Sequence, residues 1–227
     1  MNFVDIKPGT SAEGSEIIAF RTDPKSESYI YLMAGVHGDE VEGVYVCSKL
    51  FDWLKGHEDL DIPLVVIPIL NVDGYRMGTR TNARGVDLNR NLPSGNWSKE
   101  SREAKYFPGE NALSELENQY LVKLFNKYKP KFIVSIHSWK PMINYNGAGC
   151  KSAAEIMHAH NGYKMVDEIE GHPTPGSLGE FGPEKYKTPV LTFECPLHSE
   201  KSLKAIWAEN EKAFKGLFES DLFKNLK

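Results

Sequence analysis

Three nearly continuous apolar runs, far apart in the chain, place the strongest constraint on its fold. They are PLVVIPIL, KFIVSIH and TPVLTFECP, at positions 63–70, 131–137 and 188–196. Strands without polar alternation are typical of a sheet that is covered on both faces. Helical periodicity occurs before, between and after these runs, in the stretches 40–56, 115–130 and 199–220. This alternation of strands and helices predicts a three-layer α/β/α sandwich.

Shorter signals extend the pattern toward both ends of the chain. EIIAF at 16–20 and SYIYLMAG at 28–35 combine β-branched and aromatic residues between turn formers, which predicts two further strands. Gly56 suits the C-terminal end of the helix at 40–56. Ser199 is in position to cap the last helix.

The composition is that of a globular protein with one core. The chain has 227 residues with 41% hydrophobic content, and no repeat or linker divides it, so we expect a single domain, 1–227. The net charge of -4 disfavours a nucleic-acid-binding surface. Three widely spaced cysteines suit a reducing compartment. The first residues lack the features of a signal peptide and no apolar stretch reaches membrane-spanning length, so we expect a cytoplasmic protein without a membrane partner.

One long segment, 71–111, lacks convincing periodicity. It is rich in Gly, Asn, Arg and Pro and contains the polar stretch TRTNARGVDLNRNLP at 79–93. Irregular segments of this length inside compact domains are usually functional or disordered. The density of charged and amide side chains favours a functional loop.

Four side chains that can bind a metal or move a proton follow the ends of apolar runs. His37 and Glu40 come after the strand at 28–35, His137 ends KFIVSIH, and Glu194 follows VLTF. Because ligands of α/β sheets gather outside the carboxyl ends of strands, we expect these residues to converge. Two imidazoles and one carboxylate, with water in the fourth position, make a catalytic zinc site. Glu194 would then act as general base on that water.

Each of these residues also has an ordinary explanation when it is taken alone. His37 and Glu40 could be surface polarity, His137 a hydrogen-bonded core histidine, and Glu194 the last solvated residue of its strand. The motif GVDLNRN at 85–91 makes the joint interpretation stronger. The remaining histidines are assigned surface or structural roles: His57, His158, His160 and His198.

In order and spacing, the motifs resemble those of the zinc carboxypeptidase family related to pancreatic carboxypeptidase A. They are HGDE at 37–40, NVDGYRMGTRTNARGVDLNRN at 71–91, SIHSW at 135–139 and TFECP at 192–196. The resemblance implies a mixed, mostly parallel central sheet and one Zn²⁺ per chain. The short length and GHPTPGSLG at 171–179 resemble the bacterial murein peptide amidase branch. That branch cleaves the γ-D-glutamyl–diaminopimelate bond of cell-wall peptides.

The resemblance implies roles around the metal at the matching positions. His37, Glu40 and His137 would ligate zinc. Glu194 would serve as general base and afterwards as proton donor to the leaving amine. Asp87 would lie behind His37 and orient its ring.

The resemblance also implies a way of holding the substrate. Asn89 and Arg90 would bind its terminal carboxylate, for which the planar guanidinium is suited. A further arginine would polarise the scissile carbonyl and stabilise the oxyanion. Arg80 is preferred for this role by its place in TRTNA, and Arg84 is the rival.

One departure from the family concerns the tyrosine that usually covers the bound substrate. The related position here is His172, which we expect to contact substrate. Three tyrosines elsewhere are alternatives for the covering role: Tyr145, Tyr163 and Tyr186. Trp139, directly after SIHS, would either wall the pocket or pack in the core.

The predicted activity is zinc-dependent hydrolysis of the amide bond to a C-terminal residue of a small peptide with a free carboxylate. One alternative is a zinc deacylase of the aspartoacylase or succinylglutamate desuccinylase type, which acts on N-acyl amino acids. Another is a metal-free peptide-binding module, which would not need all of His37, Glu40, His137 and Glu194. The exact substrate and the oligomeric state stay open.

Overall fold

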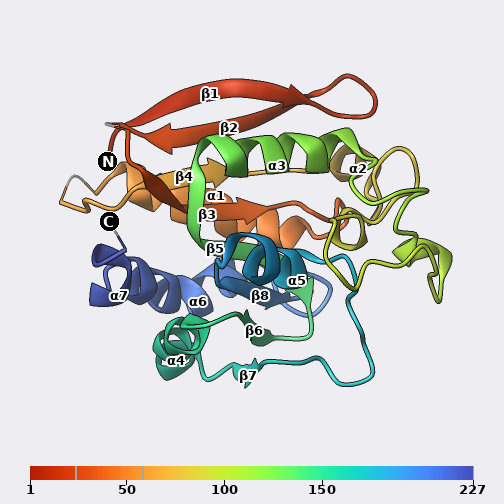
Figure 1. Ribbon diagram of the computed structural model, residues 1–227. Coiled ribbons are helices and arrows are strands. Elements are labelled where there is room, and N and C mark those ends of the chain that lie inside the picture. Colours follow the sequence, from red (N-terminus) through yellow and green to blue (C-terminus); the bar gives the residue numbers. More distant parts are fainter. Residues whose placement is uncertain (24, 58, 227) are drawn as a thin grey trace.

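A single eight-stranded sheet runs through the computed structural model, which describes residues 1–23, 25–57 and 59–226 (Figure 1). The strand order is β1-β2-β4-β3-β5-β8-β6-β7. In chain order the strands are β1 Phe3–Thr10, β2 Glu16–Thr22, β3 Ser28–Ala34, β4 Leu64–Ile67, β5 Lys129–Trp139, β6 Met142–Asn146, β7 Lys164–Val166 and β8 Val190–Pro196.

The middle of the sheet is parallel and its flanks are mixed. Strands β4, β3, β5 and β8 pair in parallel, as does the edge pair β6 and β7. The pairs β1–β2, β2–β4 and β6–β8 are antiparallel. The expected mixed, mostly parallel sheet is therefore confirmed. The carboxyl ends of β3, β5 and β8 lie at one edge, where ligands of such sheets bind.

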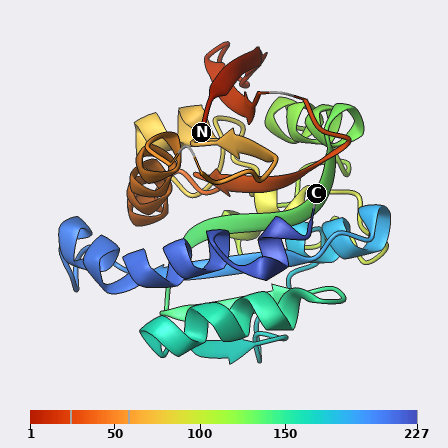
Figure 2. The ribbon, with the colours of Figure 1, turned by 90° about the vertical axis from the view of Figure 1, so that its left-hand side faces the viewer.

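Helices cover both faces of the sheet (Figures 1 and 2). On one face α1 and α4 pack beside the long α6, and α7 follows α6. On the other face lie α3 and α5. The helices are α1 Val41–Lys55, α2 Val72–Met77, α3 Leu116–Lys127, α4 Cys150–Asn161, α5 Leu178–Phe181, α6 Leu203–Phe218 and α7 Asp221–Lys224, with shorter helical turns at Leu88–Arg90, Ala104–Tyr106 and Gly182–Tyr186.

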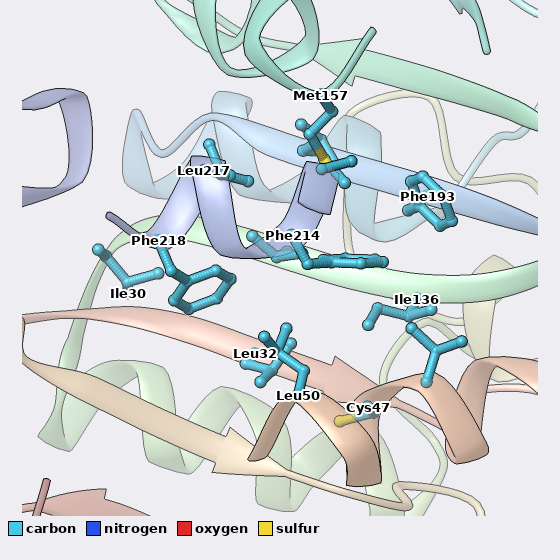
Figure 3. Packing of buried hydrophobic residues seen from close by; sticks show 14 of the residues in the cluster. Ile30, Leu32, Cys47, Leu50, Ile136, Met157, Phe193, Phe214, Leu217 and Phe218 are labelled. Atoms are coloured by element: carbon cyan, nitrogen blue, oxygen red, sulfur yellow. The ribbon is translucent and has the colours of Figure 1, made fainter. Parts of the chain in front are cut away.

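Alternation along the central strands divides the core into two apolar layers. In β3, Ile30 and Leu32 pack with α1 and α6, whereas Tyr29 and Tyr31 pack on the α3 side. Figure 3 shows the first layer, in which Phe214 of α6 lies among side chains of the sheet and α1. Because successive side chains of a strand point to opposite faces, both layers fill from the same strands. The three-layer prediction is confirmed.

The structure corrects several details of the sequence prediction. Helix α6, which the sequence predicted as the last helix, is capped by Ser202, whose side chain accepts from the Ala205 N–H, and not by Ser199. The segment 71–111 contains α2 and two short helical turns, which are too brief to show periodicity. Strands β1, β6 and β7 and helix α4 were not predicted. Within the described ranges, no helix is long and apolar enough to cross a bilayer.

Candidate active site

The connection between β3 and α1 carries the first two site residues. Gly38 packs so closely on α2 that an added Cβ would lie 2.0 Å from the carbonyl carbon of Gly74. Its N–H points at the carbonyl oxygen of Arg80, 3.4 Å away. These contacts fix the short loop between the strand and the helix. His37 and Glu40 project from it and are both buried.

The other two residues come from neighbouring strands. His137 of β5 and Glu194 of β8 are register partners in a parallel pair. Ile136 and Phe193, one residue earlier in each strand, belong to the apolar layer under α1 and α6. His137 and Glu194 therefore point to the opposite face, at the carboxyl end of the sheet.

The structure brings three of these side chains together as a group that could hold a metal ion. The ligand atoms offered by His37, Glu40 and His137 all lie within 4.8 Å of one another. Glu40 Oε1 is 2.7 Å from His37 Nδ1, and Glu40 Oε2 is 2.8 Å from His137 Nδ1. The two Nδ1 atoms are 3.3 Å apart. Two imidazoles and a carboxylate are a donor set that zinc accepts in catalytic sites, so the residues present fit this metal.

The Nε2 atom of each histidine ring also contacts a side-chain oxygen of the protein. Asp87 Oδ1 lies 3.1 Å from His37 Nε2, and Ser135 Oγ lies 2.9 Å from His137 Nε2. Such contacts fix the orientation and tautomer of a ligating ring. The other carboxylate oxygen of Asp87 accepts from Arg80 Nε at 3.0 Å. Asp87 therefore links His37 to Arg80.

The charges of this cluster stabilise one another. Burial alone would raise the pKa of the Glu40 carboxyl, but His37 and His137 outweigh burial and hold it well below its usual range. Asp87 behaves in the same way, because His37 and Arg80 offset its burial and lower its pKa. Both carboxylates are thus ionised at neutral pH, as a metal ligand and its orienting partner must be.

Glu194 is the contrasting carboxyl group of the site. Its side chain is buried, and its Oε2 has no hydrogen-bond partner among the residues that the structure describes. Burial raises its pKa to about 7, and the charge of Glu40 adds to this, against the lowering effect of His137 and Arg80. A carboxyl group with a pKa near neutrality can both accept and return a proton.

A pocket of about 690 Å³ opens over these residues, which is large enough for the end of a peptide. Asn89 and Arg90 line it beside the metal-site group. Asn89 Oδ1 accepts from the Leu178 N–H at 2.9 Å, which leaves the amide NH₂ as a donor. Arg90 is buried, and burial lowers its pKa, with Arg80 adding to this effect. A buried guanidinium beside an amide donor can bind a carboxylate.

Arg80 and Arg84, the two rivals for the oxyanion role, are placed differently. Arg80 lines the pocket, and its Nη1 is 3.6 Å from Glu40 Oε1. Arg84 is exposed and lies outside the pocket lining, in a turn held by the side chain of Asn82. The prediction that Arg84 contacts substrate therefore has no support in this geometry.

His172 lies in the pocket wall, whereas the three alternative tyrosines lie elsewhere. The His172 ring meets Trp139, which also lines the pocket, at 4.9 Å between ring centroids. Tyr145, Tyr163 and Tyr186 are absent from the described pocket lining. Tyr163 stacks on Phe193 in the core.

The sequence prediction missed several residues of the pocket. Tyr106 and Arg102 belong to the segment predicted as functional, but no pattern selected them individually. Thr192 could have been found, because it precedes Glu194 by two residues and so shares its face. Asn144 and Asn146 come from β6, a strand that was not predicted.

Known proteins resemble the chain over most of its length. The family model described as zinc carboxypeptidase matches residues 2–176. Murein peptide amidase A of Vibrio campbellii is 30% identical over 199 residues, which cover 83% of this chain and 77% of that protein. The crystal structure of murein-tripeptide amidase from Escherichia coli O157 is 27% identical, with a TM-score of 0.70 over 91% of this chain and 90% of that one. Bovine thrombin-activatable fibrinolysis inhibitor has a TM-score of 0.79 over 98% of this chain and 91% of that one; at 19% identity this likeness shows the fold alone.

Proposed function

The chain belongs to the zinc carboxypeptidase family, and we propose that it is a zinc-dependent amidase acting on murein peptides. It would hydrolyse the amide bond to a C-terminal diaminopimelate, the bond that joins it to the γ-carboxyl of D-glutamate. The whole chain, 1–227, would act as one catalytic domain. The observation that carries this proposal is the convergence in one pocket of a His–Glu–His group, a buried arginine and Glu194, whose Oε2 has no hydrogen-bond partner among the described residues.

His37, Glu40 and His137 would hold one Zn²⁺. When bound there, zinc supplies a Lewis acid that lowers the pKa of a water molecule and polarises the substrate carbonyl. The ionised Glu40 and the ring orientations fixed by Asp87 and Ser135 prepare the three ligands for this role.

Glu194 would move the proton during hydrolysis. Its Oε2, free of other partners within the described residues, accepts the proton of the attacking water as the water oxygen bonds to the carbonyl carbon. Glu194 then gives that proton to the leaving nitrogen as the C–N bond breaks. The products are a carboxylic acid and a free amine, and the side chain of Glu194 is again a carboxylate at the end of the cycle.

Arg80 would stabilise the negative charge that develops on the carbonyl oxygen. Asp87 holds its guanidinium at the pocket wall through Nε and Nη2, at 3.0 and 2.9 Å. Burial alone would lower the pKa of Arg80, but Asp87 and Glu40 outweigh burial and raise it, so the cation persists. A donor fixed before the reaction costs no reorganisation in the transition state.

Asn89 and Arg90 would select a substrate with a free terminal carboxylate. Arg90 is buried and has no carboxylate partner within ion-pair distance in the described part of the chain. Leaving one member of a buried charge pair unpaired costs about 2–5 kcal/mol. An amidated terminus should therefore be rejected by tens- to thousands-fold.

The lining of the pocket supports diaminopimelate as the released residue. Four acidic side chains line it besides Glu40 and Glu194, and no ion pair engages them within the residues described: Asp39, Asp167, Glu168 and Glu180. Together with the arginines they suit a residue that carries both an ammonium and a carboxylate on its side chain. The two relatives named as murein peptide and murein-tripeptide amidases support the same class of substrate.

Steady-state kinetics with three substrates test this function. The zinc-loaded protein should cleave L-Ala-γ-D-Glu-diaminopimelate far faster than the same tripeptide with an amidated C-terminal carboxylate. It should cleave N-acetyl-aspartate poorly. Equal rates on the free and amidated tripeptides would rule out the carboxylate clamp. A preference for N-acetyl-aspartate would support the deacylase alternative, and failure to turn over any of them would favour a binding module.

A further inference from the structure

Four cationic side chains surround the ring of Tyr106 at the pocket wall. The Cζ atoms of Arg80, Arg90 and Arg102 lie 5.1, 5.5 and 4.7 Å from the ring centroid, and Lys105 Nζ lies 5.0 Å from it. All five residues line the pocket. The negative face of an aromatic ring offsets part of the repulsion among such charges. Three guanidinium groups carry more positive charge than one terminal carboxylate can neutralise.

Two of these cations have carboxylate partners in the protein. Arg80 is neutralised by Asp87, and Lys105 lies 3.2 Å from Glu103. Across the described residues, neither Arg90 nor Arg102 has a carboxylate within 4.0 Å. The proposed function uses Arg90 for the terminal carboxylate of the substrate. Arg102 is left as a pocket cation without a counter-charge among those residues.

Arg102 is also held in a defined position. Its Nη1 donates to the carbonyl oxygen of Gly171 at 3.1 Å, and its Nη2 lies 2.9 Å from Nδ1 of His172. The ring of Tyr106 packs against the guanidinium, and Tyr106 ends a helical turn closed by its own N–H to the carbonyl of Glu103 at 3.0 Å. A guanidinium oriented in advance loses little entropy when it binds an anion.

We propose that Arg102 binds a second carboxylate of the substrate, apart from the terminal carboxylate that Arg90 and Asn89 hold. This inference rests on the proposed function. It makes Arg102 a specificity-determining residue, with Tyr106 and His172 as its supports. The enzyme would thus recognise a small peptide by two carboxylates rather than one.

The proposed substrate offers two candidates for this carboxylate. A γ-linkage leaves the α-carboxylate of D-glutamate free on one side of the scissile bond. Diaminopimelate carries a distal carboxylate on the other side. Both present the same chemistry to Arg102, and substrate analogues distinguish them.

Three tripeptides and two variants of Arg102 test the proposal. The peptides are L-Ala-γ-D-Glu-diaminopimelate, the same peptide with the D-glutamyl α-carboxylate as a carboxamide, and L-Ala-γ-D-Glu-L-Lys, which lacks the distal carboxylate. On the first peptide, Arg102→Gln should lower kcat/KM about tenfold at low salt, mainly through KM, because Arg102 is exposed and its charge is partly screened. Arg102→Lys should recover part of the loss. The peptide that lacks the recognised carboxylate should be insensitive to both substitutions.

Arg76→Gln is the matched control, since Arg76 is exposed on α2, donates to Ser15 Oγ and lies outside the pocket lining. Insensitivity of the carboxamide peptide would assign Arg102 to the glutamyl carboxylate, and insensitivity of the lysine peptide to the distal one. An equal loss on all three peptides would mean that Arg102 only braces the loop at His172, and it would overturn the proposal, as would no loss on any. If the wild type cleaves none of the peptides, the proposed function fails. The affinities of the same peptides for wild type and Arg102→Gln would then be measured by calorimetry. The substitution should weaken binding of the peptides that carry the recognised carboxylate and leave binding of the peptide that lacks it unchanged.

Discussion

His137 of β5 and Glu194 of β8 are register partners on adjacent parallel strands, and both point to the same face of the sheet. Neighbouring strands lie about 4.8 Å apart. The proposed metal ligand and the proposed base are therefore set side by side by the backbone ladder itself. The irregular segments 71–111 and 167–180 line much of the rest of the pocket, and the first of them also supplies Asp87, which contacts His37, and Arg80.

Removal of one proposed metal ligand, His137, should abolish zinc binding. In His137→Ala, Glu40 loses one of its two histidine partners and the donor set falls from three to two. Elemental analysis should find about one zinc per chain in the wild type and almost none in the variant, with activity lost in parallel. His198→Ala, at an exposed histidine, should keep both zinc and activity. A fully active, zinc-loaded His137→Ala protein would contradict the assignment.

Substitution of Glu194, the proposed base, should separate catalysis from metal binding. Glu194→Gln keeps the shape of the side chain but cannot accept a proton. Turnover should fall by roughly 10²- to 10⁴-fold while zinc content stays unchanged. Glu200→Gln, an exposed change of the same kind, should have no effect. Normal turnover by the Glu194→Gln protein would place the base elsewhere.

The two rival arginines should respond differently to the same substitution. Arg80 lines the pocket and is held by Asp87, whereas Arg84 is exposed outside it. Arg80→Gln should lower kcat by about 10²- to 10³-fold, as expected for loss of one oxyanion donor. Arg84→Gln should leave kcat and KM near the wild-type values. The reverse result in steady-state assays would move the oxyanion role to Arg84.

The stability of the metal-free protein should depend on pH through Glu194. Burial raises its pKa from 4.5 to about 7, so between these values the folded protein holds a proton that the unfolded chain has released. This contribution to stability is complete below pH 4.5 and is lost as the pH rises through 7, by about 3 kcal/mol in all. Glu194→Gln removes it. In thermal unfolding of the chelated proteins, the melting temperature of the variant should rise relative to that of the wild type from about pH 5 to about pH 8. Parallel plots of melting temperature against pH for the two proteins would contradict the raised pKa of Glu194.

The central fold could be predicted because it rests on long apolar patterns. The runs that form β4, β5 and β8, and the helices α1, α3 and α6, were visible in the sequence. The edge strands were not: in β1, FVDIKPGT, five of the eight residues are polar or turn-forming, and β7 has only three residues. Strands of that kind are held by pairing with a neighbour, which leaves little trace in their own composition.

The site residues next to predicted strands could likewise be predicted from the sequence, whereas the contacts between irregular segments could not. His37, Glu40, His137 and Glu194 stand next to predicted strands, so their convergence could be inferred from the sheet. The contact of Arg102 with His172 joins residues seventy positions apart through two irregular segments. No periodicity reports such packing, and only the structure shows that Tyr106 gathers the arginines of the pocket.

Mass spectrometry of a single hydrolysis reaction tests the account most directly. The zinc-loaded protein is incubated with L-Ala-γ-D-Glu-diaminopimelate, with Glu194→Gln protein as the matched control. The wild type should release two products, free diaminopimelate and the dipeptide L-Ala-D-Glu, and the variant should release almost none. Intact tripeptide after prolonged incubation, cleavage at the L-Ala–D-Glu bond, or equal product from both proteins would contradict the proposed function.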